Sequence, residues 1–196
     1  MIIMSMQALL NPEDEMLVPF EKLHRAYKGQ GLAAALGGIS EPRERIRYTV
    51  DFIERTTGLT GVGEYLTLLL ELDSFFLNED RHTNNLAVIR NEKTMEFRLC
   101  PIFDHGLALL SDLNDYPVDR DVYDCMSHVR AKPFDVDFDV QVEAAEALYG
   151  SQLKLSFSRT DVSKTLDSVR MLYSNSVISR VEQTLYEQMR RYPVYF

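Results

Sequence analysis

The sequence of 196 residues contains no tryptophan and only two cysteines, Cys100 and Cys125. Two cysteines do not make a disulfide framework or a structural zinc site, and their scarcity indicates a reducing compartment, by default the cytoplasm. Basic residues are outnumbered too, because 21 Lys and Arg stand against 30 Asp and Glu, for a net charge of −9. This balance disfavours non-specific binding to nucleic acid through a broad basic surface, so we expect no direct nucleic-acid partner.

The sequence also has no long hydrophobic run, no repeat and no Gly/Ser/Pro linker. Its apolar opening, 1–10, has no basic region and is interrupted by Ser5 and Gln7, so we expect neither a signal peptide nor a membrane partner. What remains is an ordinary globular composition, with 45% hydrophobic and 26% charged residues. We therefore expect a single domain over 1–196.

Helical spacing of apolar residues is clearest over 41–57, where Pro42 suits the first turn and Gly58 ends the helix. A second helix is expected over 62–76, with an apolar face wide enough to lie at the centre of the domain. Further helical periodicity is found over 139–149, 161–173 and 176–191. The sequence thus predicts a mainly α (α+β) protein with a helical body.

Two other stretches are not helical. The short apolar runs 86–90 and 97–103, separated by polar residues, predict a β-hairpin embedded in the helical body. The stretch 111–139 is rich in Asp and predicts a long irregular segment with at most short helices. This stretch follows the hairpin. Its acidic residues either face solvent or bind a basic partner or substrate.

Polar residues flank this hairpin on both sides. Residues 78–85 read Asn-Glu-Asp-Arg-His-Thr-Asn-Asn and precede the first strand, whereas Asp104 begins an Asp-His-Gly sequence after the second strand. In an antiparallel hairpin the start of the first strand and the end of the second lie side by side. Asn85 and Asp104, which are 19 positions apart in the sequence, should therefore be neighbours in space.

These residue types are those that phosphoryl transfer requires. Asn and Asp supply hard oxygen ligands for Mg²⁺ on nucleotide phosphates, and a separate carboxylate orients or deprotonates the attacking hydroxyl. Asn85 and Asp104 fit the first task, and Asp80 fits the second. Four residues separate Asp80 from Asn85, which is the spacing of the catalytic Asp and the Asn in protein kinases. Arg81 and His82 are expected to brace the loop, and Asn78 to shape it.

The motif resembles that of the HipA-like serine/threonine kinases, whose catalytic loop has the order Asn-x-Asp-Arg-His-x-x-Asn, found here at 78–85. The continuation 99–106, with a Pro shortly before the Asp, is also similar to the metal-binding segment of that family. The resemblance implies a protein-kinase-like C-lobe, Asp80 as catalytic base, Asn85 and Asp104 as Mg²⁺ ligands, and ATP as phosphoryl donor. It also implies a protein substrate and toxin–antitoxin biology with an antitoxin-type partner.

Three functions remain open at this point. The first is transfer of phosphate to a protein Ser/Thr hydroxyl, and the second is a degenerate kinase-like module that binds or regulates without catalysis. The third is a lipid or small-molecule kinase, because the Asp-Arg-His-x-x-Asn order is similar to that of lipid kinases too. Only Lys22 and Lys28 precede the motif, and no Gly-x-Gly-x-x-Gly is present. We therefore expect the kinase N-lobe to be absent from this chain or to be supplied by a partner chain.

Two metal-binding alternatives are weaker. The four histidines and the Asp104-His105 pair suggest a His-Asp phosphohydrolase, but the pair is reversed and follows a strand. The run of alternating Asp from Asp135 to Asp139 resembles part of a calcium loop, but Val140 stands where that loop needs Gly. A solvated segment is the better interpretation of this run.

Overall fold

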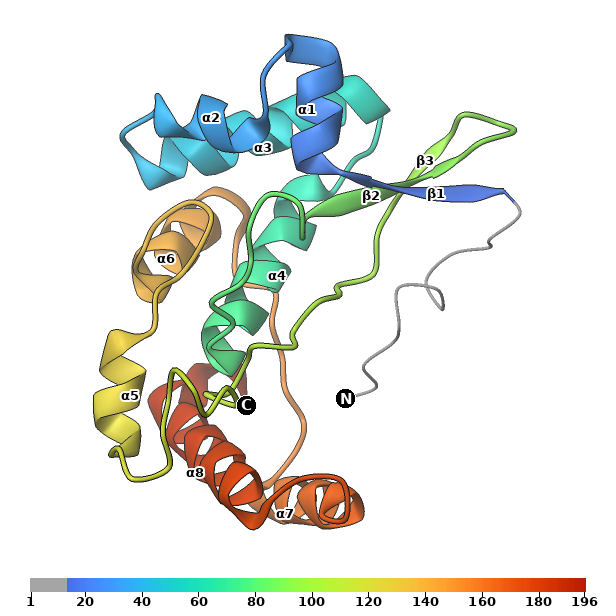
Figure 1. The fold of residues 1–196 in the computed structure, drawn as a ribbon. Coiled ribbons are helices and arrows are strands. Elements are labelled where there is room, and N and C mark those ends of the chain that lie inside the picture. Colours follow the sequence, from blue (N-terminus) through green and yellow to red (C-terminus); the bar gives the residue numbers. More distant parts are fainter. Residues whose placement is uncertain (1–13) are drawn as a thin grey trace.

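The computed structural model describes residues 14–196, which form a helix-rich body with one small antiparallel sheet (Figure 1). The strands are β1 (Glu15–Pro19), β2 (Ala87–Asn91) and β3 (Phe97–Leu99). The helices are α1 (Phe20–Lys28), α2 (Leu32–Gly37), α3 (Pro42–Thr57), α4 (Val62–Phe76), α5 (Val122–His128), α6 (Phe138–Tyr149), α7 (Arg159–Val169) and α8 (Asn175–Arg191), followed by a 3-10 turn, η2 (Pro193–Tyr195). No helix in this described part is long and apolar enough to cross a membrane.

The predicted hairpin is present as β2 and β3, with Val88 opposite Leu99. The second strand is shorter than the predicted 97–103, because Pro101 cannot donate to a strand ladder and the chain turns there toward residues 78–85, the polar loop. Strand β1 was not predicted; it pairs antiparallel with the other side of β2 and makes β2 the central strand. A strand of five residues with no clear alternation gives little periodic signal.

The long helices agree with the sequence prediction. The expected helix 41–57 is α3, with Pro42 in its first turn, and it ends at Gly58, whose φ of 75° favours glycine. The expected helix 62–76 is α4, and the periodic stretches near the C-terminus correspond to α6, α7 and α8. Helix α7 ends at Val169, before the predicted end at 173, and Leu172, which the periodicity places on its apolar face, is exposed. Helices α1 and α2 were not predicted, since each is too short to show several turns of periodicity. The segment 111–139 contains only the short helix α5 before the first residues of α6, as expected.

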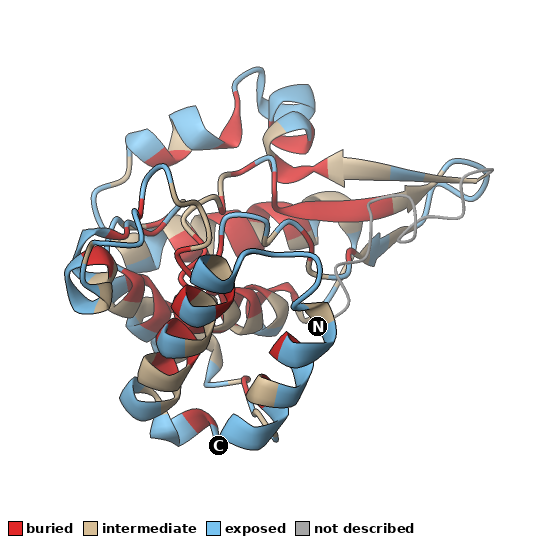
Figure 2. Cartoon of the chain, turned by 60° about the horizontal axis from the view of Figure 1, so that its bottom comes forward, coloured by how far each residue is buried: buried red, intermediate tan, exposed pale blue. Residues whose placement is uncertain are grey.

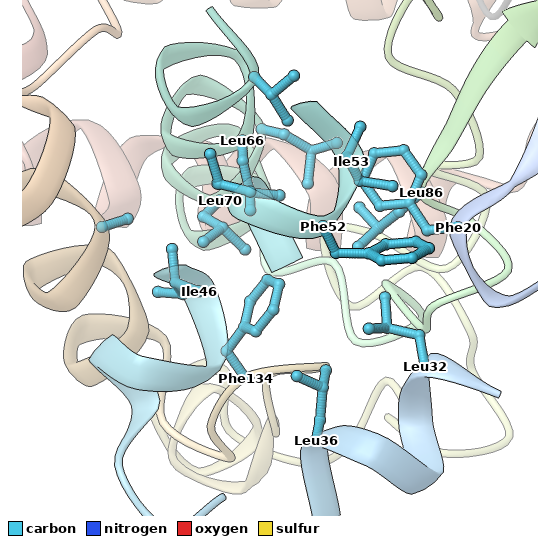
Figure 3. Packing of buried hydrophobic residues seen from close by; sticks show 14 of the residues in the cluster. Phe20, Leu32, Leu36, Ile46, Phe52, Ile53, Leu66, Leu70, Leu86 and Phe134 are labelled. Atoms are coloured by element: carbon cyan, nitrogen blue, oxygen red, sulfur yellow. The ribbon is translucent and has the colours of Figure 1, made fainter. Parts of the chain in front are cut away.

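Helix α4 lies at the centre of the molecule and contributes to two hydrophobic clusters. Its first half packs in a cluster with α1, α2, α3 and α6, into which Phe134 also points (Figure 3). Its last turn contributes Phe75 to a second cluster formed with α7 and α8. The buried residues accordingly concentrate on the inward faces of the helices, whereas their outer faces are exposed (Figure 2).

The close packing of α4 against α6 depends on Gly63. A Cβ atom at this position would lie 2.3 Å from Cδ1 of Tyr149, a distance that side chains do not tolerate. This contact places α6 directly on α4 and so fixes the helix that carries the polar loop at its C-terminal end. Helix α4 ends at Leu77, which has a φ of 52°, and the polar loop begins at the next residue.

Candidate active site

A fully buried ion pair lies beneath the polar loop. Nε of Arg81 donates to Oδ2 of Asp73 at 2.7 Å and Nη2 donates to Oδ1 at 3.0 Å. Both side chains have no solvent exposure. Such a two-point pair has a strongly preferred geometry, so it fixes the loop relative to the last turn of α4.

The remaining nitrogen of Arg81 joins the two halves of the predicted site. Its Nη1 donates to the carbonyl of Asn85 at 2.9 Å and to the carbonyl of Phe103 at 2.8 Å. The residue at the start of the hairpin and the residue just before Asp104 therefore contact one atom. Asn85 and Asp104 were predicted to be neighbours in space, and the structure brings the carbonyls of Asn85 and of Phe103, the residue before Asp104, to the same nitrogen.

Asn78 and His105 complete this buried network. Nδ2 of Asn78 donates to Oδ1 of Asp73 at 2.8 Å and to the carbonyl of Asp104 at 3.4 Å. Nε2 of His105 lies 3.3 Å from Oδ1 of Asp73. The structure thus places Asn78 and Arg81 inside the support of the loop, and it adds Asp73 and His105, which the sequence analysis had not assigned to it.

The carboxylate of Asp80 stands on the surface above this network, with 35% of its side chain exposed. Its backbone is held from both sides, because its N–H donates to Oδ1 of Asn78 at 3.4 Å and its carbonyl accepts from Nδ2 of Asn85 at 2.9 Å. The carboxylate itself lies 3.9 Å from Nε2 of His82 and 3.8 Å from Nζ of Lys132. Its position is therefore fixed while its oxygens stay accessible to a hydroxyl group.

Asn85 and Asp104 can both offer side-chain oxygen atoms. The amide nitrogen of Asn85 is used to bind Asp80, which leaves Oδ1 as an acceptor. Asp104 is exposed and has a φ of 61°, a conformation that a non-glycine residue keeps only where its surroundings hold it. Here the carbonyls of Phe103 and Asp104 are both held by donors from the loop.

This donor set is suited to Mg²⁺ rather than to an all-protein metal cage. No group of three or more His, Cys, Asp or Glu side chains that could hold a metal occurs between residues 14 and 196. Mg²⁺ is commonly bound by one or two protein oxygens together with water and substrate phosphates. One amide oxygen and one carboxylate from adjacent segments fit that mode of binding.

The long segment after the hairpin is tied to the loop through Glu79, a residue that the sequence analysis did not single out. Its Oε2 accepts from the hydroxyl of Tyr116, and its Oε1 accepts from the backbone N–H of Arg130 at 2.9 Å. Burial, together with the hydrogen bond to Glu79, raises the pKa of the Tyr116 phenol. The segment is thus irregular but anchored at two points.

The groups considered for other metal sites do not assemble. His24 is buried in α1, where its ring nitrogens bind the carbonyl of Gln30 and the hydroxyl of Tyr48, both at 2.7 Å. In the acidic run, Asp137 caps the N-terminus of α6, and Asp139 accepts hydrogen bonds from Arg191 and Tyr192. Cys100 and Cys125 are both buried as free thiols. These residues have structural contacts within the described chain.

Of the residues that the sequence analysis missed, Asp73 had a detectable signal. It is an acidic residue in a helix whose broad apolar face predicts burial, and a buried carboxylate requires a partner. The contacts of Glu79 and Lys132 had no comparable signal, because they depend on how an irregular segment folds back on the loop.

Comparisons with known proteins bear on the fold. No protein-family model matches the sequence, and no curated protein matches it. Among solved structures, the chain is similar to the crystal structure of a Helicobacter pylori proinflammatory kinase, CtkA, with a TM-score of 0.60 and 16% sequence identity. The match covers 90% of this chain and 68% of that chain. The chain has a kinase-like fold.

The predicted fold class, a kinase-like C-lobe with a helical body and an embedded hairpin, is therefore confirmed. Within this fold, the hairpin carries the polar loop at its start and the Asp104 segment at its end. An identity of 16% shows the fold alone, so the chemistry of the site has to be argued from its own residues.

Proposed function

We propose that this chain is the C-lobe of a HipA-like kinase that transfers the γ-phosphoryl group of ATP to a Ser or Thr hydroxyl of a protein. The observation that carries the proposal is the contact of one arginine, Arg81, with the carbonyls of both Asn85 and Phe103. This contact supports a working arrangement of the loop and the Asp104 segment. The network uses the backbone carbonyls of Asp80, Asn85 and Asp104, so their side-chain oxygens are available to substrate and metal.

In this proposal Asp80 is the catalytic base. It accepts the proton of the acceptor hydroxyl while the hydroxyl oxygen forms a bond to the γ-phosphorus. The bond from that phosphorus to the β,γ-bridging oxygen breaks, and ADP leaves with the electron pair. The proton then passes from Asp80 to solvent.

Asn85 and Asp104 would hold Mg²⁺, which neutralises the phosphate charge when it is bound. The contribution of the chain is to fix these two oxygen donors through Arg81 and Asn78 before the nucleotide arrives. Fixed donors need little rearrangement during the reaction, and this lowers its barrier. We further propose that an N-lobe, from a partner chain or another segment, covers the phosphates.

The decisive test is calorimetric titration of the chain with ATP in Mg²⁺, beside the Asp104→Asn variant. We expect binding that the substitution removes. Transfer from radiolabelled ATP to protein is then compared between the chain and Asp80→Ala. If nucleotide binds, transfer is absent and Asp80→Ala retains every partner interaction, the chain is a non-catalytic module and the proposal is wrong.

A further inference from the structure

A small pocket adjoins Asp80 and is not used by the mechanism above. It has a volume of about 290 Å³ and lies between α2, α3, the polar loop and the Lys132-Pro133 turn. Its polar lining includes Arg45, His82 and Lys132, and its apolar lining includes Leu36 and Pro133. In a chain with a net charge of −9, the charged side chains that line this pocket are basic.

Lys132 lines the pocket, and the residues on both sides of it in the sequence are anchored. The N–H of Arg130 donates to Glu79, and the N–H of Ala131 donates to the carbonyl of Val136 at 2.9 Å. On the other side, Phe134 is fully buried in the main core (Figure 3). The position of Lys132 near Asp80 is therefore determined by anchored backbone, although its ammonium group is half exposed.

Arg45, which also lines the pocket, is bound to the same turn. Its Nη1 donates to the carbonyl of Phe134 at 2.8 Å, and its Nε donates to the carbonyl of Ile39 at 2.7 Å. These neutral partners do not compensate its charge. His82, which also lines the pocket, has an Nδ1 atom that is buried without a hydrogen-bond partner in the described chain.

Glu21, an acidic residue outside the loop that contacts two of the pocket residues, already has partners of its own. Glu21 contacts the pocket residues Ala33 and Thr83, but Oε2 accepts from both of these and Oε1 accepts from Arg25. Burial opposes ionisation of Glu21, yet these hydrogen bonds lower its pKa, so the group is ionised and fully paired. It does not supply the counter-charge for Lys132 and Arg45.

We propose that this pocket selects the acceptor by taking an Asp or Glu side chain one or two positions from the phosphorylated Ser or Thr. This inference rests on the proposed kinase function and adds the class of substrate to it. Nζ of Lys132 lies only 3.8 Å from Oδ1 of Asp80, so an acceptor hydroxyl on Asp80 and a carboxylate on Lys132 would come from side chains that are close together in the acceptor sequence. The acceptor carboxylate replaces Asp80 as partner of Lys132 and leaves Asp80 free to take the proton.

The test uses three Ser peptides that differ only at the flanking position, which is Glu, Gln or Lys. The full chain is assayed for transfer from radiolabelled ATP in Mg²⁺. We expect kcat/KM to be roughly tenfold higher for the Glu peptide than for the Gln peptide, because one charge-assisted hydrogen bond contributes a difference of this size. Lys132→Glu should reverse the preference toward the Lys peptide. Lys164→Glu, which makes the same charge change on the distant helix α7, should leave the preference unchanged.

A second measurement separates this inference from the proposed function. Fluorescent versions of the peptides with Ala in place of Ser are titrated with the chain, and their anisotropy is followed without ATP. Selective binding of the Glu peptide that Lys132→Glu reverses supports the pocket even if the chain alone shows no transfer.

Three results would overturn the inference. The first is equal transfer to the three peptides, which leaves the kinase proposal intact. The second is a preference for Glu that survives Lys132→Glu. The third is transfer to a small anionic alcohol such as glycerol 3-phosphate and to none of the peptides. Absence of selective peptide binding would reject the pocket, and absence of Mg²⁺-ATP binding as well would reject the kinase proposal together with it.

Discussion

Asp73 and Arg81 form a two-point ion pair that is completely buried, eight positions apart at the junction of α4 and the polar loop. The pair is not itself able to contact a substrate, yet every proposed site residue is connected to it by one or two hydrogen bonds. The stability of the site therefore depends on a group that lies beneath it.

We expect Asp73→Ala to destabilise the chain by about 3–5 kcal/mol, because it leaves the buried Arg81 guanidinium without a counter-charge. The free energy of unfolding in urea measures this loss. The double variant Asp73→Leu with Arg81→Met should be less destabilised than the two single changes added together. Removal of the exposed Asp51–Arg55 pair is the control, and it should change the stability by less than about 1 kcal/mol. A cost for Asp73→Ala as small as that of the control would contradict the buried-pair interpretation.

Asp80→Asn and Asp104→Asn should separate catalysis from nucleotide binding. Both side chains are solvent accessible, so neither change should alter the unfolding midpoint appreciably. We expect Asp80→Asn to reduce transfer by about 10²–10⁴-fold with ATP binding retained, since it removes only the proton acceptor. Asp104→Asn should weaken binding of Mg²⁺-ATP itself. If Asp80→Asn abolished ATP binding and Asp104→Asn did not, the assignment of Asp80 as base and Asp104 as metal ligand would be wrong.

Glu79→Gln should loosen the segment 111–130, which Glu79 anchors through Tyr116 and Arg130. Hydrogen exchange is expected to become faster over this segment and to stay unchanged over α3. Tyr116→Phe removes one of the two anchors and should give the same pattern with smaller amplitude. Protection that is unaffected by either change would show that the neighbouring hydrophobic contacts of Tyr116 hold the segment alone.

Glu146→Gln should stabilise the chain at neutral pH. Burial, followed by the hydrogen bond to the fully buried Glu71, raises the pKa of Glu146 above its ordinary 4.5. The folded chain then holds a proton that the unfolded chain releases, so this contribution to stability is complete below pH 4.5 and is lost as pH rises through the folded pKa. A glutamine amide replaces the proton as donor to Glu71 at all pH values.

The measurement is the urea midpoint as a function of pH from about 4 to 8. The urea midpoint of the wild type should decline as the pH rises above 4.5, and Glu146→Gln should remove this decline. The control Glu64→Gln, at an exposed position, should show the same decline as the wild type. An unchanged slope in Glu146→Gln would show that another group titrates in this window.

The sequence alone was sufficient for the main helices, the hairpin and the pattern from Asp80 to Asp104. Apolar periodicity and helix-ending glycines are local properties, and a hairpin brings Asn85 close to the Asp104 segment whatever surrounds it. The sequence did not predict that β3 ends before residue 103, nor that β1 is present. A strand ends where its pairing partner or its direction changes. The segment β1 is a strand only because it pairs with the free edge of β2.

The tertiary structure decided which residues support the site. Local sequence gave no sign that Glu79 would hold Tyr116 and Arg130, or that Lys132 would come within 3.8 Å of Asp80. These contacts join positions that are tens of residues apart through an irregular segment without periodicity. Their geometry follows from the burial of Phe134 and the hydrogen bonds of Arg45. The candidate site residues Asp80, Asn85 and Asp104 can therefore be identified from the sequence. Their surroundings are determined only by the tertiary packing of the chain.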